Sequence, residues 1–225
     1  MKVSVIIPSA GHGRRFGALK QFKLLNGEPI VFFAIRPFLS IKQVVEIIIV
    51  VSKNQISFLN KYFKNKNYKK NIKIVEGGDK RQDSVIQAIN SVVENSQLIC
   101  IHDAVRPFIK KNFILNCIKK CNKYDGAILA IKSTETVKFS KNKIIKKTIN
   151  RDNIWLAQTP QVFHKNKLIK AIKNAKKNKI YSTDESSLME KMGFNIRLVE
   201  GCVNNIKITY KSDWGLVKFL QNNFL

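Results

Sequence analysis

The chain has few acidic residues and few cysteines, and both scarcities limit what it can be. Only 15 Asp and Glu stand against 41 Lys and Arg in 225 residues, which gives a formal charge of +26. The four cysteines include no CxxC pair and lie in apolar segments without other metal ligands nearby; they are Cys100, Cys117, Cys121 and Cys202. Thiols in such places behave as small hydrophobic groups, so we expect no zinc site and a reducing compartment.

Long apolar runs are also missing from the sequence. No run reaches the roughly 18 residues that a membrane-spanning helix needs, so we expect no membrane partner. The first residues hold one lysine and then a strand-like segment that leads directly into a candidate functional loop. This is not the pattern of a cleavable signal, and we therefore predict a cytoplasmic protein.

The excess of positive charge has two interpretations. A charge of +26 is typical of proteins that bind nucleic acid or another polyanion. Lys, Asn and Ile are, however, abundant throughout the chain, as codon bias in an AT-rich genome would produce, and the lysine-rich stretches 61–73 and 165–179 are typical of solvated surfaces. The sequence contains no RNP-like, zinc-finger or KH-like motif. We expect no nucleic-acid partner, but a field that attracts anionic substrates.

Short β-branched runs alternate with longer segments of helical period, which predicts a doubly wound α/β fold with a mostly parallel sheet. The expected strands are 3–8, 44–51, 72–76, 98–102 and 127–131, and the expected helices between them are 29–39, 55–63, 82–93 and 112–121. No Pro/Gly/Ser linker, repeat or change of composition interrupts the chain. We therefore predict a single domain over residues 1–225, a size that can bury a substantial core.

The alternation of strands and helices breaks at about 132–152, where two alternating segments around Ser140, Lys141 and Asn142 predict a β-hairpin. A lone hairpin is marginal in water, so we expect it to pack on something, with a second subunit as the first candidate. Afterwards we expect a helix at 165–177, a helix opened by Ser182 with Glu185 in capping-box spacing, a strand at 195–199 and a last helix from Ser212.

The first expected strand ends in Ser9-Ala10-Gly11-His12-Gly13, followed by Arg14 and Arg15. The loop is neither a dinucleotide fingerprint nor a P-loop, because Phe16 stands where a third glycine would fall and no Gly-Lys-Ser/Thr follows. Small residues let backbone N–H groups approach a ligand, and arginine suits phosphate. The alternative is a strand-to-helix turn with two solvated arginines.

Two further strand ends carry polar groups. The segment EGGDKRQDSV places Asp79 where it can accept hydrogen bonds from ribose hydroxyls, although Asp83 or Ser84 can also serve as a helix N-cap, and we favour that role for Asp83. The segment HDAVRP carries Asp103, which can hold Mg²⁺ or a sugar hydroxyl or can pair with Arg106. We expect His102 to be a packed strand histidine.

The carboxyl ends of parallel strands meet at one edge of a sheet, and that edge is where α/β proteins bind ligands. These three ends would bring together a phosphate loop, a base or ribose site and an acidic group. The combination suits a nucleoside triphosphate with Mg²⁺ and attack at phosphorus.

With these residues in hand, the sequence resembles the methylerythritol phosphate cytidylyltransferases of non-mevalonate isoprenoid biosynthesis, over nearly the full chain. The resemblance rests on SAGHGRRF, KQF, EGGDKRQDSV, HDAVRPF, TINRDNIWLAQTPQVF, STDESSLMEKMGF and NNIKIT. It implies a Rossmann-like nucleotidyltransferase fold with a protruding β-hairpin dimer arm. It also implies transfer of CMP from CTP to 2-C-methyl-D-erythritol 4-phosphate, with release of pyrophosphate and with Mg²⁺ or another divalent cation as cofactor.

The resemblance also implies roles for individual residues. Arg15, Lys20 and Lys207 would be catalytic, with Lys23 as a substitute for Lys20 because the loop before it is shortened. The residues implied for nucleotide binding are Ala10, Gly11, Gly78, Asp79, Arg81 and Ser84. Those implied for the acceptor are Asp103, Arg106, Thr136, Arg151, Thr183 and Thr209, with Asp103 also near the metal and with Thr136 and Arg151 reaching the partner subunit's site.

Plainer interpretations remain for several of these residues. Thr136 and Arg151 can be hairpin surface residues, Thr183 a helix N-cap, and Lys207 one lysine among many. The nearest alternative function is a cytidylyltransferase for a pentitol phosphate such as ribitol 5-phosphate. A basic nucleic-acid-binding protein is the remote one.

Overall fold

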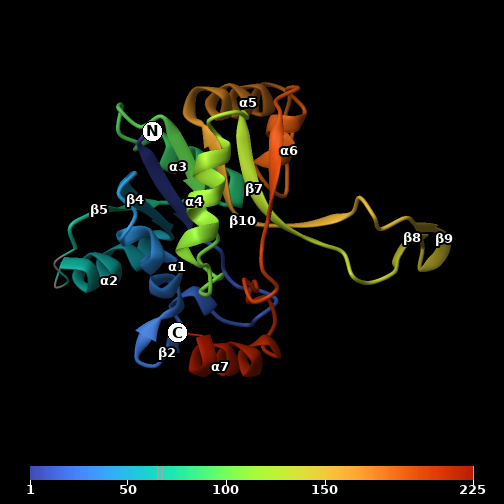
Figure 1. The fold of residues 1–225 in the computed structure, drawn as a ribbon. Helices are drawn as coiled ribbons and strands as arrows, with labels where there is room; N and C mark the ends of the chain where they lie inside the picture. Colours follow the sequence, from blue (N-terminus) through green and yellow to red (C-terminus); the bar gives the residue numbers. More distant parts are fainter. Residues whose placement is uncertain (65, 67, 225) are drawn as a thin grey trace.

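A central sheet runs through the computed structural model, which describes residues 1–64, 66 and 68–224 (Figure 1). Its strands are β1 (Val3–Pro8), β4 (Val44–Val51), β5 (Asn71–Glu76), β6 (Leu98–Ile101), β7 (Gly126–Lys132), β10 (Trp155–His164) and β11 (Ile196–Glu200). They lie in the order β11-β7-β10-β6-β1-β4-β5. All neighbours are parallel except β10, which is antiparallel to β6 and β7. The predicted mostly parallel α/β sheet is confirmed.

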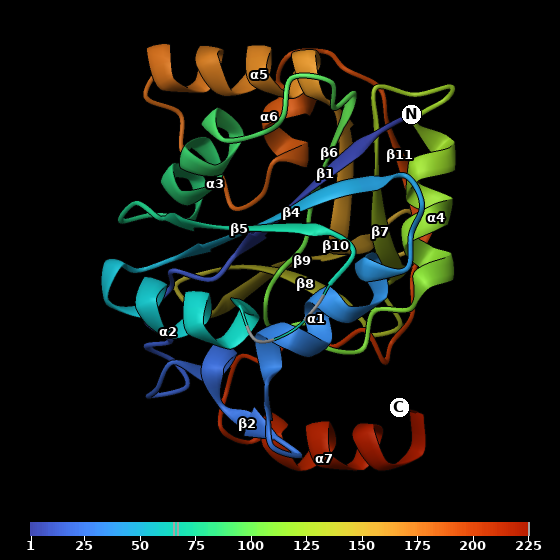
Figure 2. The same ribbon diagram turned by 90° about the vertical axis from the view of Figure 1, so that its left-hand side faces the viewer.

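Helices cover both faces of this sheet. They are α1 (Ile30–Leu39), α2 (Lys53–Lys64), α3 (Arg81–Asn90), α4 (Lys111–Lys120), α5 (Lys165–Lys177), α6 (Ser186–Glu190) and α7 (Asp213–Phe224). Figure 2 shows α3 and α5 on one side of the sheet and α1 and α4 on the other. A short turn, η1 (Lys20–Phe22), and a two-strand ribbon, β2 (Leu24–Leu25) and β3 (Glu28–Pro29), connect β1 to α1.

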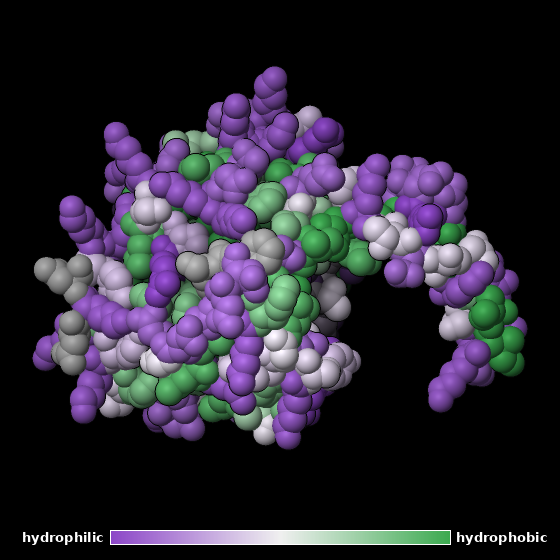
Figure 3. Space-filling view, turned by 60° about the horizontal axis from the view of Figure 1, so that its bottom comes forward, coloured by the Kyte–Doolittle hydropathy of each residue, from purple (hydrophilic) through white to green (hydrophobic). Residues whose placement is uncertain are grey.

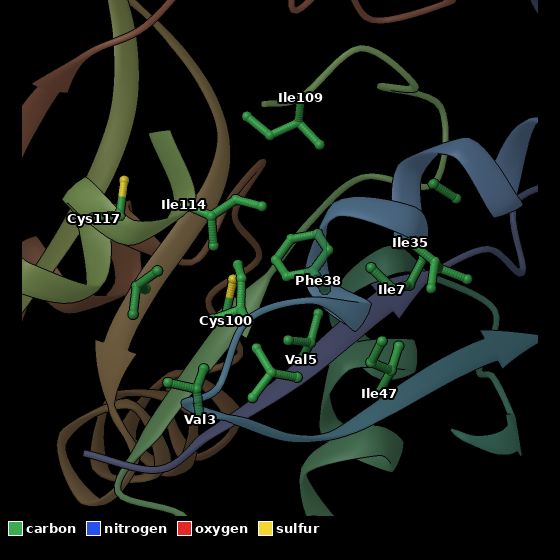
Figure 4. Packing of buried hydrophobic residues seen from close by; sticks show 14 of the residues in the cluster. Val3, Val5, Ile7, Ile35, Phe38, Ile47, Cys100, Ile109, Ile114 and Cys117 are labelled. Carbon is green, nitrogen blue, oxygen red and sulfur yellow. The ribbon is translucent and has the colours of Figure 1, made fainter. Parts of the chain in front are cut away.

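The core follows from the alternation of side chains along the buried strands. In β1, Val5 and Ile7 pack into the cluster that holds residues of α1, α2 and α4, whereas Ile6 packs into the cluster of α3, α5 and α6. Figure 4 shows the first cluster, in which Cys100 and Cys117 lie among aliphatic side chains. Because Cys121 is buried there as well, the expectation of cysteines as small hydrophobic groups is confirmed for all but Cys202, which is only partly buried.

Strand β10 was not predicted from the sequence, although it lies between β6 and β7. Its middle reads Gln158-Thr159-Pro160, which breaks the apolar pattern of a buried strand. The pairing with β7 shifts register between Ala157 and Gln161, so the proline falls at an irregularity of the ladder rather than inside it.

Two predicted helix caps are wrong. Helix α6 begins at Ser186, and the Ser187 N–H donates to Asp184 at 3.2 Å, so Ser182 and Glu185 do not form a capping box. Helix α3 begins at Arg81, and Asp83 lies in its first turn, where it accepts the Lys80 N–H at 3.3 Å. In both helices an aspartate satisfies free N–H groups, but at a position that the spacing alone did not give.

The predicted hairpin exists and projects from the sheet (Figure 1). It consists of antiparallel β8 (Val137–Lys141) and β9 (Ile144–Ile149), and Asn142 and Lys143 turn the chain with positive φ. The large apolar side chains Phe139, Ile144 and Ile145 are more than half exposed on it. We call residues 132–152 the arm; what covers its apolar side chains stays a prediction.

None of the described helices is both long and apolar enough to span a membrane.

Candidate active site

Three parallel strands deliver their loops to one pocket. β1, β5 and β6 end at Pro8, Glu76 and Ile101, and the loops that follow form the pocket wall. The residues that line it are Pro8, Ser9, Ala10, Gly11, Gly13, Arg14, Arg15, Lys20, Gln21, Gly78, Asp79, Lys80, Arg81, Ser84, Asp103, Ala104, Val105 and Lys207.

Most of the predicted site residues lie in this pocket. Those that line it are Ala10, Gly11, Arg15, Lys20, Gly78, Asp79, Arg81, Ser84, Asp103 and Lys207. Those placed outside its lining are Arg106, Thr136, Arg151, Thr183 and Thr209. Thr136 and Arg151 belong to the arm, where both are exposed, and the Arg151 guanidinium donates to the Thr134 carbonyl.

The loop after β1 is held in place by a buried glutamine. The Gln21 side-chain amide donates to the carbonyls of Ser9 at 2.7 Å and Gly11 at 2.9 Å. Gly13 has a φ of 64°, and a Cβ there would lie 2.0 Å from the Ala18 carbonyl oxygen, so only glycine fits this turn. The bonds from Gln21 therefore tie this loop to η1 and fix the position of two of its carbonyls in the pocket wall.

The loop after β5 packs directly on the first. A Cβ added to Gly77 would lie 2.7 Å from both the Ala10 Cβ and the Ser84 Oγ. The Ser84 hydroxyl donates to the Gly78 carbonyl at 3.3 Å. Glycine at 77 therefore lets the two ligand-facing loops touch, and Asp79 is exposed beside them.

Asp103 is the electrostatic centre of the pocket. Its carboxylate is buried and lies 2.7 Å from Lys207 Nζ and 3.6 Å from the Nε atoms of Arg81 and Arg106. Burial acts to raise the pKa of Asp103, but the three cations outweigh it and hold the pKa well below its usual range. Arg106 supports the carboxylate from behind the pocket and donates to the Asn205 carbonyl at 2.6 Å.

Lys20 and Lys23 have different surroundings. Lys20 lines the pocket and donates to the Thr209 carbonyl at 3.3 Å. Burial, together with Arg15 and Lys207, lowers the pKa of Lys20 from its ordinary value. The Lys23 ammonium instead lies 4.6 Å from the ring centre of Trp214 and does not line the pocket. The geometry favours Lys20 over Lys23 as the lysine of the pocket.

His102 is the packed histidine expected from the sequence. It is fully buried, its Nε2 lies 3.2 Å from the Arg106 carbonyl and its Nδ1 lies 3.0 Å from the Thr159 hydroxyl. Burial lowers the pKa of His102 to about 4. The ring is therefore neutral at physiological pH, and its hydrogen bonds to the Arg106 carbonyl and the Thr159 hydroxyl hold the chain on either side of Asp103.

The pocket suits a divalent cation that is shared with phosphate. Within residues 1–64, 66 and 68–224, no group of three or more His, Cys, Asp or Glu side chains is arranged to hold a metal. Asp103 offers an ionised oxygen donor beside a cationic pocket. Mg²⁺ usually takes one or two carboxylates and completes its shell with water and substrate phosphates, so the residues fit this mode of binding.

Sequence reasoning missed two residues that support the pocket. Gln21 stands in the quoted KQF motif, but its amide bonds to the first loop depend on a fold that the motif does not reveal. Glu185 was assigned to a helix cap, whereas its carboxylate accepts two bonds from Arg81. The only signal for Glu185 was its place in the STDESSL motif.

Known proteins are similar to this chain in sequence and in architecture. The family model for 2-C-methyl-D-erythritol 4-phosphate cytidylyltransferase matches residues 3–222. The chain belongs to this family. Enzymes of that name from Fusobacterium nucleatum and Clostridioides difficile are 37% and 35% identical to it; the alignments cover 98% and 97% of this chain and 96% and 93% of theirs.

Solved structures agree with the assignment to the cytidylyltransferase family. The crystal structure of 4-diphosphocytidyl-2C-methyl-D-erythritol synthase from Anaerococcus prevotii matches with a TM-score of 0.88 at 28% identity and covers 99% of both chains. The 2-C-methyl-D-erythritol 4-phosphate cytidylyltransferase from Francisella tularensis matches with a TM-score of 0.82 at 32% identity, over 97% of this chain and 99% of the other. The resemblance inferred from the sequence is thereby confirmed.

Proposed function

We propose that this chain transfers CMP from CTP to 2-C-methyl-D-erythritol 4-phosphate, giving 4-diphosphocytidyl-2-C-methyl-D-erythritol and pyrophosphate. The observation that carries the proposal is the meeting of Arg15, Lys20 and Lys207 with Asp103 in one pocket, between two loops that can hold a nucleoside. The family membership supplies the identity of the two substrates.

The nucleoside half of CTP would occupy the wall made by the loops after β1 and β5. The pocket is lined here by the small residues Ala10, Gly11 and Gly78, so backbone groups can come close to a planar base. The exposed Asp79 carboxylate is available to ribose hydroxyls, and Ser84 fixes the Gly78 carbonyl in this wall.

The reaction is an in-line displacement at the α-phosphorus. The acceptor is a phosphate monoester and already an anion near neutral pH, so it needs no protein base. Arg15, Lys20 and Lys207 would stabilise the negative charge that builds up on the five-coordinate transition state. A divalent cation bound with the triphosphate would supply further charge neutralisation, with Asp103 as its protein ligand. Lys207 is poised beside that carboxylate at 2.7 Å.

The acceptor would lie on the Asp103 side of the pocket. Arg106, Thr183 and Thr209 are assigned to this region by the family resemblance, although they do not line the pocket of the isolated chain. Thr136 and Arg151 would come from the partner subunit, because the arm carries them away from the body of their own chain (Figure 1). We accordingly propose a homodimer joined through the arm.

Pyrophosphate release tests the proposal. With CTP, Mg²⁺ and 2-C-methyl-D-erythritol 4-phosphate we expect turnover, and clearly less when ATP or GTP replaces CTP. Ribitol 5-phosphate is the matched acceptor, and we expect it to react much more slowly. Faster release with ribitol 5-phosphate would assign the chain to the pentitol reaction, and no release with either acceptor would refute the proposal.

A further inference from the structure

Glu185 is a buried acid that lies behind the pocket wall rather than in it. Its side chain is 3% exposed, and the residue immediately precedes α6. Arg81 Nη1 donates to both carboxylate oxygens of Glu185, at 2.6 and 2.8 Å. Arg81 Nε lies 3.6 Å from Asp103, and Arg81 itself lines the pocket. The guanidinium therefore bridges a carboxylate in the pocket and a carboxylate outside it.

The residues on either side of Arg81, Lys80 and Gln82, contact the segment 180–182 just before Glu185. The Gln82 amide donates to the Ile180 carbonyl at 3.2 Å and accepts the Ser182 N–H at 3.2 Å. The Lys80 ammonium lies 3.4 Å from the ring centre of Tyr181. The start of α3, which follows the nucleoside-facing loop at 77–79, is thus attached to residues 180–185.

A charged carboxylate that is buried as Glu185 is loses its hydration, which costs free energy of folding. This cost argues that the residue does more than add stability. Burial raises the pKa of Glu185 above its ordinary value, although Arg81 opposes that shift. Buried ion pairs are weak evidence for stability, because well-packed apolar residues often serve as well. Arg81 is, however, held at two of its nitrogens, since Nη1 donates to both oxygens of Glu185 and Nε lies 3.6 Å from Asp103, and contacts at two nitrogens restrict the orientation of the planar guanidinium.

We propose that Glu185 is a positioning residue for the nucleotide: its carboxylate fixes Arg81, and Arg81 holds the start of α3 and faces the phosphates of CTP. The proposal rests on the proposed function, since it takes CTP as the ligand of the pocket. Glu185 does not line the pocket, so its effect on CTP would be transmitted through Arg81.

A double-mutant cycle read out by calorimetric CTP binding tests this route. Glu185→Gln keeps the size of the side chain and removes its charge, and we expect it to weaken CTP binding by about tenfold or more. In the Arg81→Met background the same substitution should change the CTP dissociation constant by less than about threefold. If Arg81→Met alone does not fold, Arg81→Met/Glu185→Gln, which leaves no unpaired charge, should bind CTP about as well as Glu185→Gln.

Asp184→Asn is the matched control. Asp184 adjoins Glu185 and is bonded to Gln161, Ser186 and Ser187, but its side chain makes no bond to Arg81. We expect this variant to lower the melting temperature and to keep CTP affinity within about threefold of the parent. Equal loss of affinity in Asp184→Asn and Glu185→Gln, or effects of Arg81→Met and Glu185→Gln that multiply in the cycle, would overturn the proposal.

Failure of the inference and failure of the proposed function have different outcomes. If the parent protein binds CTP and turns over methylerythritol phosphate while Glu185→Gln binds CTP normally, only the inference fails. If CTP binding depends on Glu185 and Arg81 as expected but no acceptor reacts, only the proposed reaction fails.

Discussion

At the scale of single residues, the pocket pairs a partly exposed lysine with a buried acid. The Lys207 side chain is 41% exposed, whereas the Asp103 side chain is 8% exposed and surrounded by three cations. A long, half-exposed lysine can follow charge as it develops on a substrate, but a buried carboxylate cannot move without losing its partners. Charge stabilisation is therefore expected from Lys207, and orientation from Asp103.

Lys207, which acts on developing charge, and Asp79, which would hold the ribose, should give different kinetic changes when each is substituted. Lys207→Ala should lower kcat by about a hundredfold or more with little change in KM for CTP, because the lysine acts at the transition state. Asp79→Ala should mainly raise KM for CTP, by about tenfold, since its carboxylate would hold the ribose in ground and transition states alike. Steady-state kinetics with Lys218→Ala as the control measures both effects. Lys218 belongs to α7 and does not line the pocket. If both variants changed kcat and KM to a similar extent, the proposed difference between Lys207 and Asp79 would be contradicted.

Gly11 offers a second test at this scale. A Cβ at Gly11 would meet nothing within 4 Å, so Gly11→Ala should fold as well as the parent. The added methyl group would nevertheless enter the pocket, and we expect CTP to bind about tenfold more weakly. Gly215→Ala in α7 also has open space, and it should leave CTP affinity intact. Unchanged affinity in Gly11→Ala would mean that the nucleotide does not approach this loop.

At the scale of elements, a helix, strand or site residue was predictable where its cause lies in neighbouring residues, and it was missed where its cause is a contact with a distant residue. β1 and β4 are apolar apart from Ser4 and Glu46, so their strands and the loops after them were predictable. β10 was not, because its buried polar residues are satisfied by distant partners: Gln158 donates to the Cys202 carbonyl and accepts from Asn205. Glu185 was misassigned for the same reason, since Arg81 lies 104 residues away in sequence.

The arm is the element whose role is tested most directly. Exposed Phe139, Ile144 and Ile145 would lie against the partner in the proposed dimer, and Figure 3 shows apolar side chains exposed towards the end of the arm. Phe139→Ser/Ile145→Ser should sediment as a monomer and lose most turnover while still binding CTP. Lys146→Ser on β9 is the polar control and should remain dimeric. A double variant that stays dimeric and fully active would exclude the arm as the interface.

At the scale of the whole molecule, several of the scarce acids form ion pairs within the chain. Glu28, Glu46, Asp125 and Glu185 each lie within ion-pairing distance of a lysine or arginine, as Asp103 does. The remaining cations are spread over the surface, and the face in Figure 3 is hydrophilic over most of its area. This distribution agrees with charge as a property of overall composition, with an electrostatic benefit for an anionic substrate.

Global stability should depend on pH through His102. In the folded protein its Nε2–H donates to the Arg106 carbonyl and its Nδ1 accepts from Thr159, so a second proton would disrupt a complete set of bonds. Its pKa falls from 6.5 to about 4 on burial. As pH falls, the unfolded chain takes up the proton first, and stability is lost from about pH 7 down to about pH 4 and then levels off.

Between about pH 7.5 and pH 5, this residue should cost about 2 kcal/mol of unfolding free energy. Asp103 adds little in this interval, because its pKa is lowered and its contribution is lost only in more acidic solution. His102→Gln has no proton to bind, so its unfolding free energy should fall by about 2 kcal/mol less than that of the parent between the two pH values. Urea unfolding followed by tryptophan fluorescence measures the difference. Equal losses in the two proteins would show that His102 is already protonated, or free to be, in the folded state.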